Sequence, residues 1–473
     1  MIKQDNFFSQ YWHSKYVRRN IALAWPLALN ALLMQSMLMI DTLLVSPLGE
    51  VSLAAMGIAT TIVAFIMGIQ MALANGSQLV MSRAVGSQSQ QALTQACWSA
   101  MAINFVVAAG FWLILLLFES DIVALITADE ALQQQVLRYL AVAKYVVLFN
   151  AVTQVLIALF NSLGQTKIAF KGYLIELPIN AALSYAFIYG LTIGDVSLTP
   201  QLGVVGAAVG SIVAIAVRFI FLGVCVLKLE NQSALLSLRI NTATESPTSF
   251  LANMRKHAIE IFPVAVNVTM LSIGVSVYQL LYSQLSINAY VAITLMLPWM
   301  RAGGQFITAW AHSSAISISQ AIGSRQLQDL EDNVNVSIQL AVVISVLTMM
   351  FFWILSFWVA DIYPEMTPET YQALAVIAPI YILLPLVRGY NTVHGHVLRA
   401  MGYTTSVFKI NFTGQWVVSI PLCALLILYF DASIFWAFAI QPFEEIIKAG
   451  PFRYLARKAV KDFSEQDAQR LSY

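Results

Sequence analysis

Charged residues are scarce in this chain of 473 residues. Asp, Glu, Lys and Arg make up only 10% of it, whereas the hydrophobic set makes up 59%. A water-soluble protein carries about 25% charged residues, because its surface must be solvated. The low charge excludes a soluble globular protein. Together with a mean hydropathy of +0.74, it indicates that lipid is the solvent for most of the surface.

Three further absences narrow the class of protein. The net charge of +1 comes with no cluster of Lys and Arg on one solvated face, which excludes nucleic acid as a partner. The cysteines, Cys97, Cys225 and Cys423, each lie inside an apolar stretch, so we interpret them as packing residues rather than disulfide or metal ligands. The basic N-terminus is followed by no small-residue cleavage site, so we expect no removable signal peptide.

The chain instead contains a succession of long apolar runs. A helix needs about twenty mostly apolar residues to cross a membrane. The runs predict an all-α polytopic membrane protein with twelve transmembrane helices, at residues 20–45, 52–82, 92–118, 135–162, 168–192, 203–228, 257–284, 290–320, 332–360, 370–400, 404–430 and 432–455.

Basic residues occur in alternate loops between these runs. Lys and Arg are found at the N-terminus, in every second loop, such as Arg83 and Lys167, and in the C-terminal tail. The other loops carry mainly acidic residues, such as Glu119 and Asp361. Because Lys and Arg stay on the cytoplasmic side of a membrane, we expect a multi-pass protein of a bacterial inner membrane with both termini in the cytoplasm.

The two halves of the chain repeat one another. Residues 74–88 and 311–325 share Ala, Ser, Ser, Ala, Gly and Ser at an offset of 237. Two other places support the repeat: Pro26, Ala28 and Asn30 recur as Pro263, Ala265 and Asn267 at the same offset, and Gly164, Thr166, Phe170 and Lys171 recur as Gly402, Thr404, Phe408 and Lys409 at an offset of 238. We therefore infer a duplication of a six-helix unit.

Because the repeat contains an even number of spans, the two halves enter the membrane in the same orientation. Two pseudo-symmetric six-helix lobes facing a central cleft are suited to alternating access. We expect a cytoplasmic N-terminus (1–19), an N-terminal lobe (20–228), a cytoplasmic linker (229–256), a C-terminal lobe (257–455) and a cytoplasmic tail (456–473).

Several segments resemble the multidrug and toxic compound extrusion (MATE) family. They are the first span with Pro26, IDTLLVSPLGEVSLAA at 40–55, GQTK at 164–167 and LGVVGAAVG at 202–210, and the likeness covers residues 20–455. It implies an antiporter that exports cationic or amphipathic organic compounds, driven by inward protons or sodium ions. The C-terminal half resembles the DinF-like more than the NorM-like pattern.

Asp41 is the principal candidate for cation coupling. A carboxylate inside a span is costly and is seldom kept without a partner or a task, although Asp41 is also near enough to the helix end to be solvated. Asn30, Met34, Met37 and Asp41 fall on one helical stripe. In the MATE family the Asp of this Asp-Thr pair takes part in coupling, and Asp41 matches it.

The fifth span departs from the family pattern. DinF-like members often have an Asp four residues after the Asn that corresponds to Asn180, but this chain has Ser184, which cannot carry a charge change. Glu176 is a substitute for that acid or else a cap or ion-pair partner of Lys171. Tyr139 matches a family tyrosine and is expected either to bond to protonated Asp41 or to pack.

The second half has no carboxylate in its seventh span, and Arg388 stands about where NorM-like members have an Asp, so we expect no coupling there. Arg301 and Arg388 are cations near mid-membrane, which either pair with carbonyls or a distant acid or face a cleft. If these arginines face a cleft, the substrate is zwitterionic or anionic. The residues proposed for the substrate cleft are Asn30, Met34, Met37, Asn267, Tyr278, Arg301, Arg388 and Asn391.

His394 and His396 are two residues apart, which places their rings on different faces of a helix, so we expect no metal site. We expect no cofactor other than the coupling ion, a proton or alternatively sodium. The expected partners are a small-molecule substrate and membrane lipid, with the protein acting as a monomer.

The sequence supports two rival functions less well. A flippase for lipid-linked or anionic substrates would also have repeated helices and buried arginines, but it would need a more cationic cleft. A membrane-embedded enzyme is disfavoured, because the sequence has no HExxH, no GxSxG and no paired intramembrane Asp, and because such an enzyme would not explain the repeat.

Overall fold

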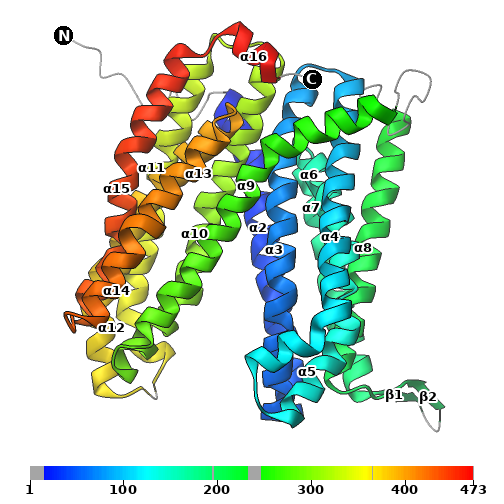
Figure 1. Cartoon of the computed structure of the whole chain (residues 1–473), viewed down its shortest axis with the longest axis vertical. Coiled ribbons are helices and arrows are strands. Elements are labelled where there is room, and N and C mark those ends of the chain that lie inside the picture. Colours follow the sequence, from blue (N-terminus) through cyan, green and yellow to red (C-terminus); the bar gives the residue numbers. More distant parts are fainter. Residues whose placement is uncertain (1–14, 194–195, 233–246, 365, 472–473) are drawn as a thin grey trace. The chain divides into compact units, whose positions relative to one another are not determined.

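The computed structural model describes residues 15–193, 196–232, 247–364 and 366–471. Within them the first half of the chain forms long helices that follow one another through short connections (Figure 1). These elements are α2 (Lys15–Val45), η1 (Ser46–Leu48), α3 (Glu50–Gly86), α4 (Gln90–Ile126), α5 (Glu130–Ala143), α6 (Val146–Ser162), α7 (Thr166–Tyr189), β1 (Leu191–Ile193), β2 (Val196–Thr199) and α8 (Val204–Gln232).

The second half repeats this arrangement of long helices. Its elements are α9 (Pro247–Tyr282), α10 (Ile287–Gly323), α11 (Leu330–Ile362), α12 (Pro368–Ala400), α13 (Thr404–Phe412), η2 (Thr413–Ser419), α14 (Ile420–Leu428), α15 (Ile434–Asp462) and α16 (Glu465–Leu471). Each of the twelve predicted spans coincides with one of these helices or with a run of helical segments.

The apolar character of the spans is uneven. Among the described residues, eight helical stretches are long and apolar enough to cross a membrane, and α5 and α6 form a ninth as a pair bent by 43°. The three remaining spans, α7, α10 and α15, carry charged residues within them: Glu176, Arg301, and Glu444, Glu445 and Lys448.

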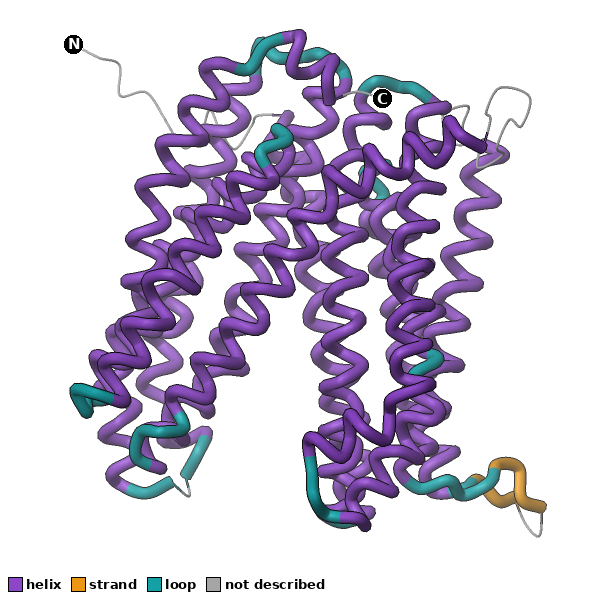
Figure 2. The backbone as a smooth tube through the Cα atoms, in the orientation of Figure 1, coloured by secondary structure: helices purple, strands orange, loops and turns teal. Residues whose placement is uncertain are grey.

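Several local features were not predicted. A two-stranded antiparallel hairpin, β1 and β2, joins α7 to α8 and projects from the ends of these helices (Figure 2). The eleventh span changes to π-helix at η2 between α13 and α14. The helix α9 begins at Pro247, inside the predicted linker, of which residues 233–246 lie outside the described part of the chain.

The chain divides into two compact units. The N-terminal unit comprises residues 29–265, and the C-terminal unit comprises residues 1–28 and 266–473. Each long helix that opens a half of the chain, α2 or α9, therefore has its first part in one unit and its second part in the other. The unit boundaries thus lie inside these helices, at residues 28–29 and 265–266.

Polar contacts hold the first part of α9 within the N-terminal unit. The Arg83 guanidinium of α3 forms an ion pair with Glu260 of α9. His257 is fully buried, and its Nε2 lies 2.9 Å from Oγ of Ser77 on α3. Gly76 permits this approach, because a Cβ there would lie 3.0 Å from Cβ of Ile261.

Two glycines allow α7 and α8 to pack closely in the N-terminal unit. A Cβ on Gly206 would lie 2.4 Å from the carbonyl carbon of Phe187, and one on Gly210 would lie 2.6 Å from both N and Oγ of Ser184. Small residues four apart let the backbones of membrane helices approach one another. This contact places Ser184 of α7 directly against α8.

Candidate functional site

The carboxylate of Asp41 lies among hydroxyl groups in the N-terminal unit. Ser184 Oγ on α7 donates a hydrogen bond to Asp41 Oδ1 at 3.1 Å, and Ser211 Oγ on α8 lies 3.4 Å from Oδ2. Asp41 itself is half-buried on α2. Hydrogen bonds from neutral donors stabilise an ionised carboxylate that water solvates only in part. Three helices thus meet at one carboxylate.

Asn180 extends this group of polar side chains by one step. Its Nδ2 donates to Ser211 Oγ at 3.0 Å, and the residue is fully buried. The Oδ1 of Asn180 has no hydrogen-bond partner among the described residues. The predicted residues Asp41, Asn180 and Ser184 are therefore brought together through Ser211, which the sequence analysis did not name.

Tyr139 and Glu176 stand apart from this hydrogen-bonded group. Tyr139 is buried on α5, and within the described chain its hydroxyl makes no hydrogen bond with Asp41. Glu176 forms an ion pair with Arg218 of α8, at 2.5 Å between Oε2 and Nη1, rather than with Lys171. The Arg218 guanidinium also lies 4.2 Å from the centre of the Tyr173 ring.

The other residues proposed on α2 lie on the Asp41 side of this helix. Asn30 is buried, and its Oδ1 has no hydrogen-bond partner in the described part of the chain. Met34 and Met37 are half-buried. The continuous helix from Lys15 to Val45 supports the predicted stripe of Asn30, Met34, Met37 and Asp41.

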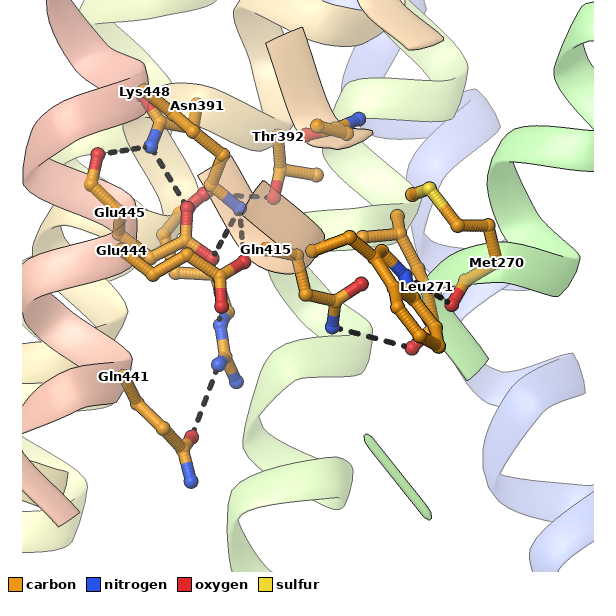
Figure 3. A network of polar contacts seen from close by, with 12 residues as sticks. Met270, Leu271, Asn391, Thr392, Gln415, Gln441, Glu444, Glu445 and Lys448 are labelled. Carbon is orange, nitrogen blue, oxygen red and sulfur yellow. Dashed lines mark hydrogen bonds and ion pairs between the residues drawn. The ribbon is translucent and has the colours of Figure 1, made fainter. Parts of the chain in front are cut away.

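The C-terminal unit contains a second group of charged side chains, which involves α12 and α15 (Figure 3). Lys448 Nζ lies 2.8 Å from Glu444 Oε1 and 3.3 Å from Glu445 Oε1, all on α15. Tyr278 of α9 donates to Glu444 Oε2 at 2.6 Å. Asn391 of α12 donates to Glu445 Oε2 at 2.8 Å. Both carboxylates thus have partners in the protein interior.

Arg388 is held more loosely than Lys448. Its Nε lies 3.5 Å from Glu445 Oε1, and its Nη2 lies 3.3 Å from Oε1 of Gln441. Its side chain is 43% exposed, whereas that of Glu445 is 9% exposed. Arg301 on α10 is exposed and has no ion pair or hydrogen bond among the described residues.

Glu444, Glu445 and Lys448 were not predicted from the sequence. The middle of the seventh span has no acid and the tenth has an arginine, but the buried acids of this group lie in the twelfth span. Two adjacent Glu residues inside the apolar run IFWAFAIQPFEEIIKAG, with Lys448 four residues after the first, were a visible signal. Two predicted residues, Tyr278 and Asn391, are partners of these acids.

Asn267 lies in another part of the C-terminal unit. Its Oδ1 accepts a hydrogen bond from Asn411 of α13 at 2.9 Å. The nearby η2 segment contacts α9 through Trp416, whose Nε1 donates to the carbonyl of Met270. Gln415 of the same segment donates to the carbonyl of Leu271 (Figure 3). Asn267 is therefore engaged between helices.

The two histidines of α12 have separate partners. His394 is buried against the Tyr390 ring, with 4.1 Å between ring centres. His396 lies edge-on to His312 of α10, with 4.5 Å between ring centres. Among the described residues, no group of three or more His, Cys, Asp or Glu side chains is arranged to hold a metal ion.

A family model described as MatE matches the chain twice, at residues 26–186 and 263–425. The two matches begin 237 residues apart, which is the offset of the repeat, so the predicted duplication is confirmed. The multidrug resistance protein MdtK of Yersinia pseudotuberculosis is 24% identical over 425 residues, covering 87% of this chain and 88% of MdtK. The uncharacterized transporter YisQ of Bacillus subtilis is 21% identical, with 85% of this chain and 86% of YisQ covered.

Solved structures share the fold. The crystal structure of the Vibrio cholerae MATE transporter VcmN in its bent form matches with a TM-score of 0.83 at 17% identity, covering 97% of this chain and 99% of VcmN. A crystal structure of MATE in the bent conformation matches with a TM-score of 0.82 at 15% identity, covering 97% of this chain and 98% of the other. The predicted fold of twelve transmembrane helices in two lobes is thereby confirmed.

Proposed function

Because the chain belongs to the MATE family, we propose that it is a secondary active antiporter, and not an enzyme, that exports small amphipathic or cationic organic compounds in exchange for inward protons. The name of MdtK, a multidrug resistance protein, supports export of several drugs. The two matched halves support alternating access between two lobes.

The observation that carries this proposal is the carboxylate of Asp41 among Ser184 and Ser211. Its charge disappears when a proton binds, and the hydroxyl donors then lose an ionic acceptor. The contacts of α2, α7 and α8 therefore differ between the two protonation states. A ligand shifts a conformational equilibrium only by its different affinity for the two states, and protonation of Asp41 supplies such a difference.

Sodium is the alternative coupling ion. Asp41, Ser184 and Ser211 offer one carboxylate and two hydroxyl oxygens, and buried Asn180 has an Oδ1 without a partner among the described residues. Hard cations take such oxygen ligands. Glu176 is less suited to coupling, because its carboxylate is already paired with Arg218.

We place the protein in a bacterial inner membrane as a monomer, with both termini in the cytoplasm. The alternating distribution of Lys and Arg along the sequence supports this orientation.

A flippase for lipid-linked or anionic substrates remains the second candidate function. The exposed, loosely paired guanidinium of Arg388 favours it, because such a group can bind an anionic headgroup.

The test is efflux of the organic cation ethidium from drug-sensitive bacteria that express the wild type or Asp41→Asn at equal levels. We expect wild-type efflux to stop with a proton uncoupler, to persist without sodium, and to be lost in Asp41→Asn. Efflux that instead requires sodium would make sodium the coupling ion. Equal efflux by Asp41→Asn would contradict a coupling role for Asp41, and no efflux by the expressed wild type would favour the flippase.

A further inference from the structure

The helices α10 and α12 run parallel in a constant register within the C-terminal unit. Near one end, Thr370 of α12 bonds to Asn288 of α10. Further along, a Cβ on Gly389 would lie 3.3 Å from Ile307, and His396 contacts His312. These contacts pair residues 82 to 84 apart along the two helices. Arg388 therefore lies beside residue 306 of α10.

Each of these two helices has a polar stripe that is at least partly exposed. On α10 the stripe consists of Arg301, Gln305, Thr308 and His312, spaced by four, three and four residues. On α12 it consists of Arg388, Thr392 and His396, spaced by four. Such spacings keep side chains on one helical face. The contact between His312 and His396 joins the two stripes at one end.

The polar stripes lie away from the apolar exposed faces of the same helices. Leu383 of α12 and Phe306 of α10 are 54% and 50% exposed. Arg388 lies five residues after Leu383, and Phe306 lies five residues after Arg301, which is about 140° around each helix. Guanidinium groups inside a span are costly against lipid and usually face water or a polar ligand. The apolar faces suit lipid, and the polar stripes suit a ligand.

The exposed charge of this surface is positive. Glu444 and Glu445 are buried behind it, and Lys448, Tyr278 and Asn391 satisfy their oxygens. Within the described part of the chain, Arg388 contacts Glu445 at 3.5 Å and donates to Gln441 at 3.3 Å, which leaves most of its five N–H groups for a ligand. Arg388 is level with residue 306 of α10, which is five residues after Arg301. Since each residue of a helix rises about 1.5 Å, Arg301 lies about 7.5 Å from that level along the helix axis.

We propose that the polar stripes of α10 and α12 bind the oxyanion of an amphipathic substrate, with Arg301 and Arg388 as the groups that contact it. The preferred substrate class is then an organic molecule with an apolar body that also carries a carboxylate, sulfonate or phosphate group. This inference rests on the proposed export function. An anionic lipid headgroup has the same chemistry and is distinguished by the experiment.

Rhodamine B and its ethyl ester test the proposal, because they share one cationic aromatic body and differ only in a free carboxylate, so the acid is a zwitterion and the ester a cation. Binding of each dye to the purified full-length protein in detergent and uptake of each into inverted proteoliposomes would be measured. The proteins are the wild type, Arg301→Gln, Arg388→Gln, Arg388→Lys and, as a matched control, Lys458→Gln, which changes an exposed cation of α15.

We expect the wild type and Lys458→Gln to prefer the free acid. Arg388→Gln and Arg301→Gln should each weaken binding of the acid about tenfold, the loss of one charge-assisted hydrogen bond, while binding of the ester stays unchanged. Arg388→Lys should restore part of the preference. Equal binding of both dyes by the wild type, or an equal loss of both in Arg388→Gln, would overturn the proposal.

Uptake of the dyes shows whether the bound acid is also transported, and the lipid composition shows whether the arginines bind a lipid instead. If the acid binds selectively but neither dye is transported, the export function fails while the binding site stands. Liposomes of phosphatidylcholine alone and with phosphatidylglycerol identify a lipid ligand. If Arg301 and Arg388 hold phosphatidylglycerol, that lipid suppresses binding of the acid in the wild type, and native mass spectrometry shows bound lipid that both Gln variants lose. Such a result would overturn the assignment to a transported substrate.

Discussion

Ser184 of α7 lies 3.1 Å from the Asp41 carboxylate of α2, at the position where the resemblance to DinF-like proteins implies a second acid. The site therefore holds one ionisable carboxylate with hydroxyl donors, and not a carboxylate pair. In the proposed antiport, a single carboxylate can still change charge once in each cycle. The hydroxyl groups determine how well its ionised state is stabilised.

Ser184→Ala should slow uncoupler-sensitive efflux. The change removes a hydrogen bond to an ionised group, worth about 1.5–3 kcal/mol, and leaves Ser211 as the remaining hydroxyl donor to Asp41. We expect about a tenfold lower initial rate of efflux, measured at equal expression. Ser184→Thr, which keeps the hydroxyl, should retain most of the rate, and identical rates for the Ala variant and the wild type would contradict the role of this hydrogen bond.

Gly210→Ala should damage the same site from α8. The new Cβ would lie 2.6 Å from N and Oγ of Ser184, so α7 and α8 must separate, at a cost of about 1–3 kcal/mol. Thermal unfolding in detergent should occur at a lower temperature, and efflux should fall. Gly223→Ala on the same helix is the control, because a Cβ there meets no atom within 4 Å. Equal unfolding temperatures for both variants would disprove close packing at Gly210.

Periodicity and hydropathy predicted the fold well, because a bilayer imposes length and apolarity on every span. The bend between α5 and α6 and the π-helical η2 were not predicted, since they depend on contacts between helices rather than on local composition. The start of α9 at Pro247 was missed because the Ser and Thr residues there are typical of a loop.

The candidate site was predictable only in part. Asp41 was found because a carboxylate is conspicuous in an apolar run, and Asn180 and Ser184 were found through the family resemblance. Ser211 was missed, because a hydroxyl is common in membrane helices and only tertiary packing brings it to Asp41. The pairing of Glu176 with Arg218 was also missed, since the two residues are 42 apart and become neighbours only when α7 packs on α8.

Removing one partner of the Glu176–Arg218 pair should destabilise the N-terminal unit. Both side chains are at most 3% exposed, and breaking a buried pair costs about 3–5 kcal/mol because the other charge is left uncompensated. Glu176→Leu and Arg218→Met should each lower the unfolding temperature in detergent. The double variant should recover most of the loss, because it leaves no buried charge.

The same double variant tests whether Glu176 takes part in coupling. If Glu176 only pairs with Arg218, the folded double variant retains uncoupler-sensitive efflux. Efflux that is lost while the unfolding temperature is restored would instead assign Glu176 a role in coupling beside Asp41.

Removing the charge of Lys448 should destabilise the C-terminal unit. It contacts two buried carboxylates at 2.8 and 3.3 Å, so Lys448→Met leaves Glu444 with no cation. We expect a loss of about 3–5 kcal/mol, seen as a lower unfolding temperature. Adding Glu444→Gln to Lys448→Met should restore much of this loss, because Glu445 keeps Arg388 and Asn391 and the group is again neutral. If the single and double variants unfold at the same temperature, charge balance is not what Lys448 supplies.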